Sequence, residues 1–332
     1  MTSLRITLLM GGTSSERDVS LASGLRMAEA LRARGHVVTA IDTATGVLSA
    51  ADQSAMLAGG VMRTVPPDTQ ALARLDRSLP QAMSELPSAD VVMLALHGGR
   101  GEDGTIQALL DLTGVPYTGS GHLASALAMD KDLSKHLFRR AGVPTANWIM
   151  APADTATVAA TLGFPCIVKP SKQGSTVGLS LVKSADELQP AITLAGTFDD
   201  EVMIEQFIPG RELTVAVLGD VALPVGEIVP EHELYDYECK YTPGMAREIF
   251  PAALTEAETA RVQALALKAF RILKLRGCAR IDFRLGPDGE FYCLEANTLP
   301  GMTQLSLVPQ AAAAAGISFP ELCERIVTLA LT

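Results

Sequence analysis

The sequence predicts an α/β protein, α+β overall, with an open parallel sheet in its first part and hairpin-built sheets in the rest. In the first 120 residues, short apolar runs alternate with helical patterns, which is typical of βαβ units. From residue 166 onward, strand-like runs are joined by turns that contain glycine, as in antiparallel hairpins. The chain has 332 residues, 48% of them hydrophobic, which is enough to bury the cores of two or three domains.

The N-terminal part of the chain holds the pattern of the open sheet. Residues 4–10 are an apolar run expected to form a buried strand, and the helix that follows is expected to begin near Ser20 and end at Gly35. Glycine just beyond the last helical residue is a common helix stop. Residues 36–41 complete the βαβ unit, and residues 90–96 supply a further buried strand. Such sheets bind ligands at the carboxyl ends of their strands, so we expect binding residues in the loops that follow.

Two polar loops follow strands of this sheet. Residues 11–17 read Gly-Gly-Thr-Ser-Ser-Glu-Arg, and residues 97–104 read His-Gly-Gly-Arg-Gly-Glu-Asp-Gly. The first lacks the glycine spacing of a dinucleotide fingerprint, which argues against a nicotinamide-dependent dehydrogenase. Taken alone, Glu16 with Arg17 is more often a solvated pair, and a lone histidine such as His97 is more often a satisfied hydrogen-bonding group than a catalyst.

The middle of the chain changes from crossover units to hairpins. A helix over residues 131–141 ends at Gly142 and marks the entry to a second domain. Residues 166–170 and 179–183 are expected to pair as a hairpin through the turn at 172–178. This turn offers successive backbone N–H groups and small side chains, which suit a phosphate group. It is not a Walker loop, and by itself such a turn is usually structural.

Further strands and one long helix complete the predicted elements. Residues 201–207 and 212–217 alternate as strands, and residues 255–275 have a helical pattern. Thr255 and Glu258 have the spacing of a capping box at the start of this helix.

The strongest hairpin signal lies near the C-terminus, at Asp288-Gly289 between two alternating apolar runs. If these two residues form the loop, counting outward brings four polar side chains to one face of the hairpin. The pairs on this face are Asp282 with Glu295 and Arg280 with Asn297. Their neighbours Phe283 and Leu294 are expected to point the other way, into a core.

This polar face predicts a metal site. Directly opposed carboxylates repel each other unless a cation lies between them. Two carboxylates and an amide oxygen form a hard ligand set, which suits Mg²⁺ or Mn²⁺ rather than zinc. The alternative is an exposed hairpin with solvated charges.

Composition excludes several classes of function. The net charge of −10 argues against nucleic acid or an anionic membrane as a partner. The five scattered cysteines indicate a reducing compartment, and no apolar run is long enough to cross a bilayer. The chain starts directly in a strand without a signal peptide, so we expect a cytoplasmic protein. Residues 43–89 are expected to form a peripheral loop with one or two short helices and carry no chemistry.

Seven motifs, in order along the chain, resemble those of the D-alanine–D-alanine ligases, and the resemblance extends from residue 4 to about residue 330. The motifs are Gly-Gly-Thr-Ser-Ser-Glu-Arg-Asp-Val-Ser20, Leu-His-Gly-Gly-Arg-Gly-Glu-Asp-Gly104, Tyr-Thr-Gly-Ser-Gly121, Met-Asp-Lys131, Val-Lys-Pro-Ser-Lys-Gln-Gly-Ser-Thr-Val-Gly178, Tyr-Asp-Tyr-Glu-Cys-Lys-Tyr241 and Leu-Glu-Ala-Asn-Thr-Leu-Pro-Gly-Met-Thr303. The family has the ATP-grasp architecture, in which two domains clasp ATP. The resemblance therefore implies an N-terminal domain over 1–120, a central domain over 121–208 and a C-terminal domain over 209–332.

The resemblance also implies a role for individual residues. The implied ATP-binding residues are Lys131, Lys169, Ser175, Glu205, Gln206, Phe207, Ile208, Glu212 and Lys240. The residues that match the ligands of two Mg²⁺ or Mn²⁺ ions are Asp282, Glu295 and Asn297. The implied substrate-binding residues are Glu16, His97, Arg280, Gly301 and Ser306, and the implied catalytic residues are Glu16, Ser175, Tyr241, Arg280 and Ser306.

The implied reaction is ATP-dependent joining of two D-alanine molecules through an acyl phosphate, for peptidoglycan synthesis, by a cytoplasmic homodimer. Residues 231–247 would close over the site as a lid. Gln206 and Phe207 replace the commoner Lys and Trp of the family, and Thr176 replaces a common Ser. Two alternatives stay open: a ligase that makes D-alanyl-D-lactate or D-alanyl-D-serine, and a non-catalytic ATP-binding regulator of the same fold.

Overall fold

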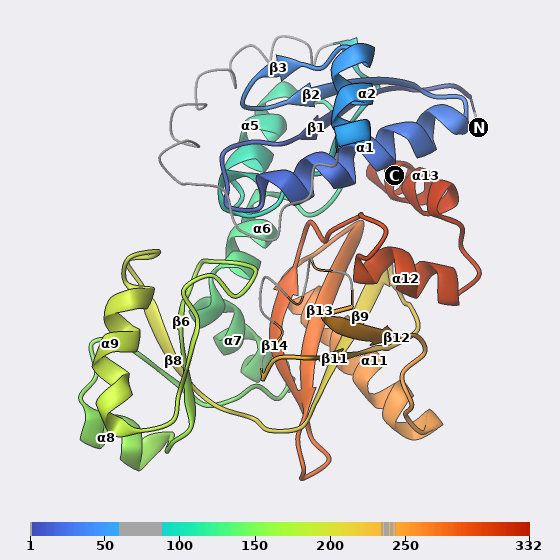
Figure 1. The fold of residues 1–332 in the computed structure, drawn as a ribbon. Helices are drawn as coiled ribbons and strands as arrows, with labels where there is room; N and C mark the ends of the chain where they lie inside the picture. Colours follow the sequence, from blue (N-terminus) through green and yellow to red (C-terminus); the bar gives the residue numbers. More distant parts are fainter. Residues whose placement is uncertain (1, 60–87, 234, 236–238, 240–241, 243) are drawn as a thin grey trace.

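The structure of the protein is a computed structural model that describes residues 2–59, 88–233, 235, 239, 242 and 244–332. Within these ranges the strands form three sheets, one each in the N-terminal, middle and C-terminal parts of the chain (Figure 1). No helix in the same ranges is both long and apolar enough to cross a membrane. The mixed α/β class predicted from the sequence is confirmed.

The N-terminal sheet is the predicted open parallel sheet. Its strand order is β3-β2-β1-β4, and β1 pairs in parallel with both β2 and β4. The strands are β1 (Arg5–Met10), β2 (Val37–Asp42), β3 (Gly46–Val47) and β4 (Val91–Leu94). The helical segments of this part are α1 (Arg17–Ala33), α2 (Ala50–Gly59), η2 (Gly99–Gly101), α5 (Thr105–Thr113) and α6 (His122–Met129).

Helix α1 begins earlier than predicted, at Arg17 rather than near Ser20. The reason is that the Ser20 side chain is buried within the helix and does not cap it. Its Oγ accepts a hydrogen bond from the Gly11 amide at 2.7 Å and donates one to the Ala95 carbonyl at 2.7 Å. This pair of hydrogen bonds holds the loop after β1 beside the segment after β4.

The middle sheet is antiparallel, with strand order β5-β8-β6-β7. Its strands are β5 (Trp148–Met150), β6 (Cys166–Pro170), β7 (Ser180–Val182) and β8 (Val202–Gln206). The helices of this part are α7 (Lys131–Arg140), α8 (Thr155–Thr161) and α9 (Ala185–Ala195). The predicted hairpin of residues 166–170 with 179–183 is confirmed by the β6–β7 pairing.

The C-terminal sheet has the order β12-β11-β9-β13-β14, with β10 paired to β9. Its strands are β9 (Arg211–Leu218), β10 (Val221–Ala222), β11 (Gly226–Pro230), β12 (Ala246–Ile249), β13 (Cys278–Leu285) and β14 (Phe291–Asn297). The helices of this part are α11 (Glu256–Ile272), α12 (Leu307–Ala314) and α13 (Phe319–Ala330). The predicted capping box of Thr255 and Glu258 is present at the start of α11.

The β13–β14 hairpin has the predicted register at its functional end and a different one near its loop. Arg280 pairs with Asn297 and Asp282 with Glu295, as predicted. Closer to the turn, Phe283 pairs with Cys293, and the Gly286 amide donates to the Glu290 carbonyl at 2.9 Å. The loop therefore has three residues, the last of them a glycine at φ +76°, which is a common hairpin form.

A β-bulge at Leu294 compensates for the longer loop. The register shift between Asp282 and Phe283 leaves Leu294 as the extra residue of β14. Leu294 is half-buried and lines a cavity between the middle and C-terminal sheets. The prediction that Leu294 points into a core is wrong because the bulge re-aims its side chain, whereas Phe283 is fully buried as predicted.

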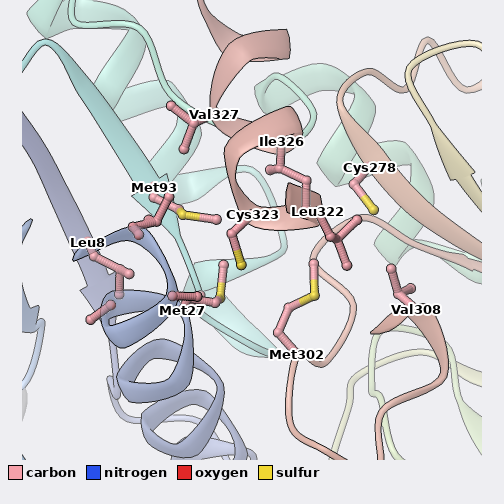
Figure 2. Packing of buried hydrophobic residues seen from close by; sticks show 14 of the residues in the cluster. Leu8, Met27, Met93, Cys278, Met302, Val308, Leu322, Cys323, Ile326 and Val327 are labelled. Atoms are coloured by element: carbon pink, nitrogen blue, oxygen red, sulfur yellow. The ribbon is translucent and has the colours of Figure 1, made fainter. Parts of the chain in front are cut away.

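Helix α13 packs against α1 and β4 of the N-terminal part, and α12 lies between α13 and β9. One hydrophobic core contains residues of β1, β4 and α1 together with residues of α12 and α13. Figure 2 shows Leu8, Met27 and Met93 of the N-terminal part facing Leu322 and Cys323 of α13. The chain thus returns to the N-terminal domain after it has formed the C-terminal sheet.

Candidate active site

Two adjoining cavities lie between the three parts of the chain. The first, of about 890 Å³, is lined by the loops after β1 and β4 and by the turn after β14. The second, of about 1010 Å³, lies between β6 and β8 of the middle sheet and the C-terminal sheet. The residues that line both cavities are Lys131, Gln173, Gly174, Ser175, Tyr235, Arg280, Glu295 and Leu307. The two cavities therefore adjoin along these residues, which face both.

Glu16 joins the N-terminal domain to the middle domain across the first cavity. Its carboxylate accepts a hydrogen bond from Ser175 Oγ, 159 positions away in the chain. Two glycines make room for it, since a Cβ would lie 2.7 Å from Glu16 Oε2 at Gly98 and 3.0 Å at Gly174. The structure thus brings together Glu16 and Ser175, which the sequence resemblance had placed in one site.

The loop that carries Ser175 has an unusual backbone. Ser175 and Thr176 have φ angles of +50° and +63°, a left-handed conformation that costs free energy, especially for a β-branched residue. Contacts with other elements hold it: Thr176 Oγ1 donates to the Tyr235 carbonyl at 2.9 Å. Lys131 Nζ donates to the Gln173 carbonyl at 2.7 Å. Backbone strain of this kind is concentrated at functional sites.

Arg280, Gly301 and Ser306 line one side of the first cavity. Ser306 Oγ accepts a hydrogen bond from the Thr303 amide at 3.0 Å and lies 2.8 Å from Thr303 Oγ1. A Cβ at Gly301 would lie 2.8 Å from Ser306 Oγ. A side chain at position 301 would therefore displace this hydroxyl group.

His97 lines the first cavity, but both of its ring nitrogens contact neighbouring protein groups. Nδ1 lies 2.8 Å from the Leu299 carbonyl and Nε2 lies 3.1 Å from Ser23 Oγ. Burial lowers the pKa of His97, which favours a neutral imidazole that donates to Leu299. Ser23 Oγ also accepts from the Met302 amide at 3.0 Å. His97 and Ser23 together fix the turn after β14 against the N-terminal domain.

Glu102 is a residue of this site that the sequence analysis did not assign. Its Oε1 accepts hydrogen bonds from the Thr298 and Leu299 amides, both at 3.1 Å, and its Oε2 accepts one from the Gly98 amide at 3.1 Å. Burial, aided by the negative charge of Glu16, raises the pKa of Glu102 to about 7. The one available signal was its place in the polar loop after β4.

The second cavity is lined by residues from β6, β8 and β9, including the predicted set Lys169, Glu205, Gln206, Phe207, Ile208 and Glu212. Lys169 Nζ donates to Glu205 Oε2 at 2.6 Å. Arg284, which the sequence analysis missed, donates to the Ile208 carbonyl at 3.1 Å and to Glu212 Oε2 at 3.2 Å. Its guanidinium also lies 5.8 Å from the centre of the Phe207 ring. Arg284 therefore holds Phe207, Ile208 and Glu212 in place on one side of the second cavity.

The predicted metal ligands lie together on the face of the β13–β14 hairpin. Asp282 accepts hydrogen bonds from Arg280 Nη2 at 2.8 Å, Thr214 Oγ1 at 2.7 Å and Asn297 Nδ2 at 3.0 Å. Glu295 lies 3.3 Å from Lys131 Nζ. No group of three His, Cys, Asp or Glu residues with metal-binding geometry occurs in the described part of the chain.

The donor set nevertheless fits a magnesium or manganese ion. Such a site would consist of two carboxylates and one amide, and hard oxygen ligands of this kind are preferred by both ions. The orientation of the Asn297 amide is set by the hydrogen bond to Asp282, and turning it over presents its oxygen instead. In this structure Lys131 and Arg280 supply the positive charge beside the two carboxylates.

Two predicted site residues, Lys240 and Tyr241, lie outside the described residues, as does part of the predicted lid over 231–247. Tyr235, which begins the same motif, is described and lines both cavities. Burial raises the pKa of Tyr235, so its hydroxyl group stays protonated at neutral pH.

Gly301→Ala is expected to displace Ser306 and weaken the site without unfolding the protein. The new Cβ would lie 2.8 Å from Ser306 Oγ, a contact that overpacking studies associate with a cost of about 1–3 kcal/mol. Steady-state kinetics should show at least a ~10-fold rise in KM for one substrate. Gly121→Ala is the matched control, because its Cβ would lie at an ordinary 3.7 Å from the Tyr117 hydroxyl. Equal kinetics for the two variants would contradict this expectation.

Comparison with known proteins shows the family to which the chain belongs. The family model of the D-ala D-ala ligase N-terminus matches residues 5–120, and that of the C-terminus matches residues 137–328. A D-alanine–D-alanine ligase of Anaeromyxobacter sp. (strain Fw109-5) is 43% identical over 98% of this chain and 96% of its own length. One of Geobacter sulfurreducens is 42% identical over 97% of this chain and 92% of its own.

Solved structures of D-alanine–D-alanine ligases have a similar fold. The crystal structure of the D-alanine–D-alanine ligase from Bacillus anthracis has a TM-score of 0.79 at 33% identity and covers 99% of this chain and 98% of its own. The same enzyme complexed with ATP gives a TM-score of 0.79 at 32% identity, covering 100% and 98%. The three-part architecture is therefore an ATP-grasp fold. Within that class, the chain belongs to the D-alanine–D-alanine ligase family.

Proposed function

We propose that the protein joins two molecules of D-alanine to D-alanyl-D-alanine at the expense of ATP, for cell-wall synthesis in the cytoplasm. The observation that carries this proposal is the shared wall between the two cavities. An acyl phosphate can form only where the substrate carboxylate meets the terminal phosphate of ATP. Lys131, Arg280 and Glu295 line both cavities, so the wall supplies two cations and one carboxylate at that meeting point.

The first cavity has the charges needed for two amino acids. Glu16 would bind the ammonium group of the first D-alanine. Ser175, which donates a hydrogen bond to Glu16, would hold the Glu16 carboxylate in place. Arg280 and Ser306, on the opposite side, would bind the carboxylate of the second D-alanine. Arginine binds carboxylates through two parallel charge-assisted hydrogen bonds. The two molecules would then lie with the amine of the second directed at the carboxyl carbon of the first.

The chemistry follows from this placement. The carboxylate of the first D-alanine attacks the terminal phosphorus of ATP, and ADP leaves. The amine of the second D-alanine then attacks the acyl carbon and gives a tetrahedral intermediate. Arg280 would face its oxyanion. The bond to phosphate then breaks, the departing phosphate takes up the proton lost from the amine, and the peptide bond remains. Exclusion of water is essential, because water would hydrolyse the acyl phosphate.

Asp282, Glu295 and Asn297 would hold Mg²⁺ or Mn²⁺, two ions per site. When bound, these ions neutralise charge on the phosphate oxygens. The second cavity would bind ATP, with Lys169 at the phosphates and Glu205 to Ile208 at the adenine. We further propose that the protein works as a homodimer with D-alanine and ATP as its small-molecule partners.

Phosphate release in the presence of ATP and Mg²⁺ tests this function. D-Alanine is expected to support release and to give D-alanyl-D-alanine by mass spectrometry, whereas L-alanine is not. D-Lactate and D-serine, each offered together with D-alanine, test the two alternative ligases. Turnover that required D-lactate would replace the proposed second substrate. ATP binding without any release would favour a regulator.

The two substrate positions are expected to respond to different substitutions. Glu16→Gln should raise KM for the first D-alanine and Ser306→Ala should raise KM for the second, each by about 10-fold or more, because each removes a hydrogen bond to a charged group. Two-substrate kinetics separate the two KM values, and Ser318→Ala, at the start of α13, is the matched control. If Ser306→Ala left the second KM unchanged while Glu16→Gln raised it, the two positions would be reversed.

A further inference from the structure

Two lysines share one buried carboxylate behind the second cavity. Lys135, on α7, is 0% exposed, and its Nζ donates hydrogen bonds to Glu205 Oε1 and, at 2.6 Å, to Thr145 Oγ1. Lys169, on β6, donates to the other oxygen of Glu205 at 2.6 Å. Glu205 therefore accepts from two ammonium groups, one on each carboxylate oxygen.

The two lysines differ in their access to a ligand. Lys169 and Glu205 line the second cavity, whereas Lys135 lines neither cavity. Thr145, the other partner of Lys135, donates in turn to the Cys293 carbonyl of β14 at 2.7 Å. Lys135 is thus anchored between α7 and β14, out of reach of a ligand. Lys169, in contrast, can give up its hydrogen bond to Glu205 and bind a ligand in the second cavity.

Lys135 provides a second positive charge beside the Glu205 carboxylate. A buried carboxylate without a cation is costly, by several kcal/mol in typical proteins. Burial would raise the pKa of Glu205, but the ammonium groups of Lys135 and Lys169 lower it to about 2, so Glu205 is ionised at neutral pH. If Lys169 were its sole cation, moving Lys169 to a phosphate group would leave that charge uncompensated.

We propose that Lys135 is a positioning residue for nucleotide binding: it keeps Glu205 neutralised, so that Lys169 can leave Glu205 for a phosphate oxygen of ATP. This inference rests on the proposed ATP site. Lys135 itself does not contact the nucleotide. Its contribution is therefore expected only for ligands that carry phosphate groups and only while Glu205 is a carboxylate.

Trp148 provides a direct readout of this network. It is the single tryptophan of the sequence, and it pairs with Glu205 across β5 and β8. Its ring centre lies 4.9 Å from Lys135 Nζ. Tryptophan fluorescence therefore reports on the surroundings of Lys135 and Glu205 when a ligand is added.

The test compares Lys135→Met in two backgrounds. With Glu205 present, Lys135→Met is expected to weaken ATP binding at least ~10-fold in calorimetry, to leave adenosine binding within ~2-fold, and to change the response of Trp148 to ATP. In the Glu205→Gln background, adding Lys135→Met should change ATP affinity by no more than ~2-fold, because no carboxylate remains to be neutralised. Lys268→Met, an exposed lysine on α11, is the matched control and should bind ATP like the wild type.

Several outcomes would overturn the inference. These are unchanged ATP affinity in Lys135→Met, equal weakening of ATP and adenosine, and a loss in the Glu205→Gln background as large as with Glu205 present. If Lys135→Met alone did not fold, the comparison of Glu205→Gln with the double variant still decides the question, since the latter carries neither buried charge. A wild-type protein that bound no ATP would contradict the proposed function, and this inference with it.

Discussion

Arg280→Lys is expected to lower kcat/KM by about 10²–10³-fold, the typical loss when one oxyanion-stabilising donor is removed. Arg280 lines both cavities and holds Asp282 through Nε at 2.9 Å and Nη2 at 2.8 Å. Lysine keeps the charge but cannot reproduce this two-pronged geometry. The same group would have to orient the second D-alanine and face the developing oxyanion.

Steady-state kinetics on the folded variant measure this effect, with circular dichroism to confirm the fold. Arg261→Lys is the control, because Arg261 forms an exposed ion pair with Glu290 at the far end of the same hairpin. Activity of Arg280→Lys within a few-fold of the control would remove Arg280 from the catalytic residues.

Glu295→Gln is expected to lower activity about 100-fold or more at moderate Mg²⁺, with partial recovery as the Mg²⁺ concentration rises. The substitution preserves shape and removes one charged ligand of the proposed metal site. We expect the free energy of unfolding to change by no more than ~1 kcal/mol, because the lost ion pair with Lys131 is offset by weaker repulsion from Asp282. The measurements are Mg²⁺ titration of activity, binding of Mn²⁺ with nucleotide present, and thermal unfolding. Full turnover at moderate Mg²⁺ would contradict the metal assignment.

Asp282→Ala is a poorer test of the same site. The structure shows that Asp282, which is buried, is the hydrogen-bonded partner of the half-buried Arg280 and of Thr214. Removing it would leave the Arg280 guanidinium without its carboxylate, and loss of one partner of a largely desolvated ion pair is destabilising in other proteins. Glu290→Gln, on the same hairpin but lining neither cavity, is the better matched control for Glu295→Gln.

The hairpin illustrates how far the sequence could predict this site. Counting outward from the predicted loop placed Asp282 opposite Glu295 correctly, because two deviations cancel. The prediction assumed a two-residue loop, whereas the loop has three residues, and the bulge at Leu294 restores the register. Turn type and bulge position depend on packing against neighbouring strands, which alternation does not encode. The error is therefore confined to Leu294 and its neighbours near the loop.

Residues that act through tertiary contacts were missed for a different reason. Lys135 lies within an ordinary helical pattern, and its burial and its contacts with Thr145 and with Glu205, 70 positions away, distinguish it from a surface lysine. Glu102 likewise acts on amides at 298 and 299. The family resemblance supplied Glu16, which lies in one of the seven motifs, and with it Arg280 and Ser306. Pairings between distant elements have no local signature, so they had to come from the structure.

The packing of α13 against α1 has a consequence for how the polypeptide matures. Because this core contains residues as far apart as Ile6 and Val327, the first domain cannot bury its apolar face until the last helix has left the ribosome. Contacts of such long sequence separation slow folding, since a large loop must close before they form. The nascent chain would therefore expose the apolar side of α1 until α13 has been made, and α13 completes the core around β1 and β4.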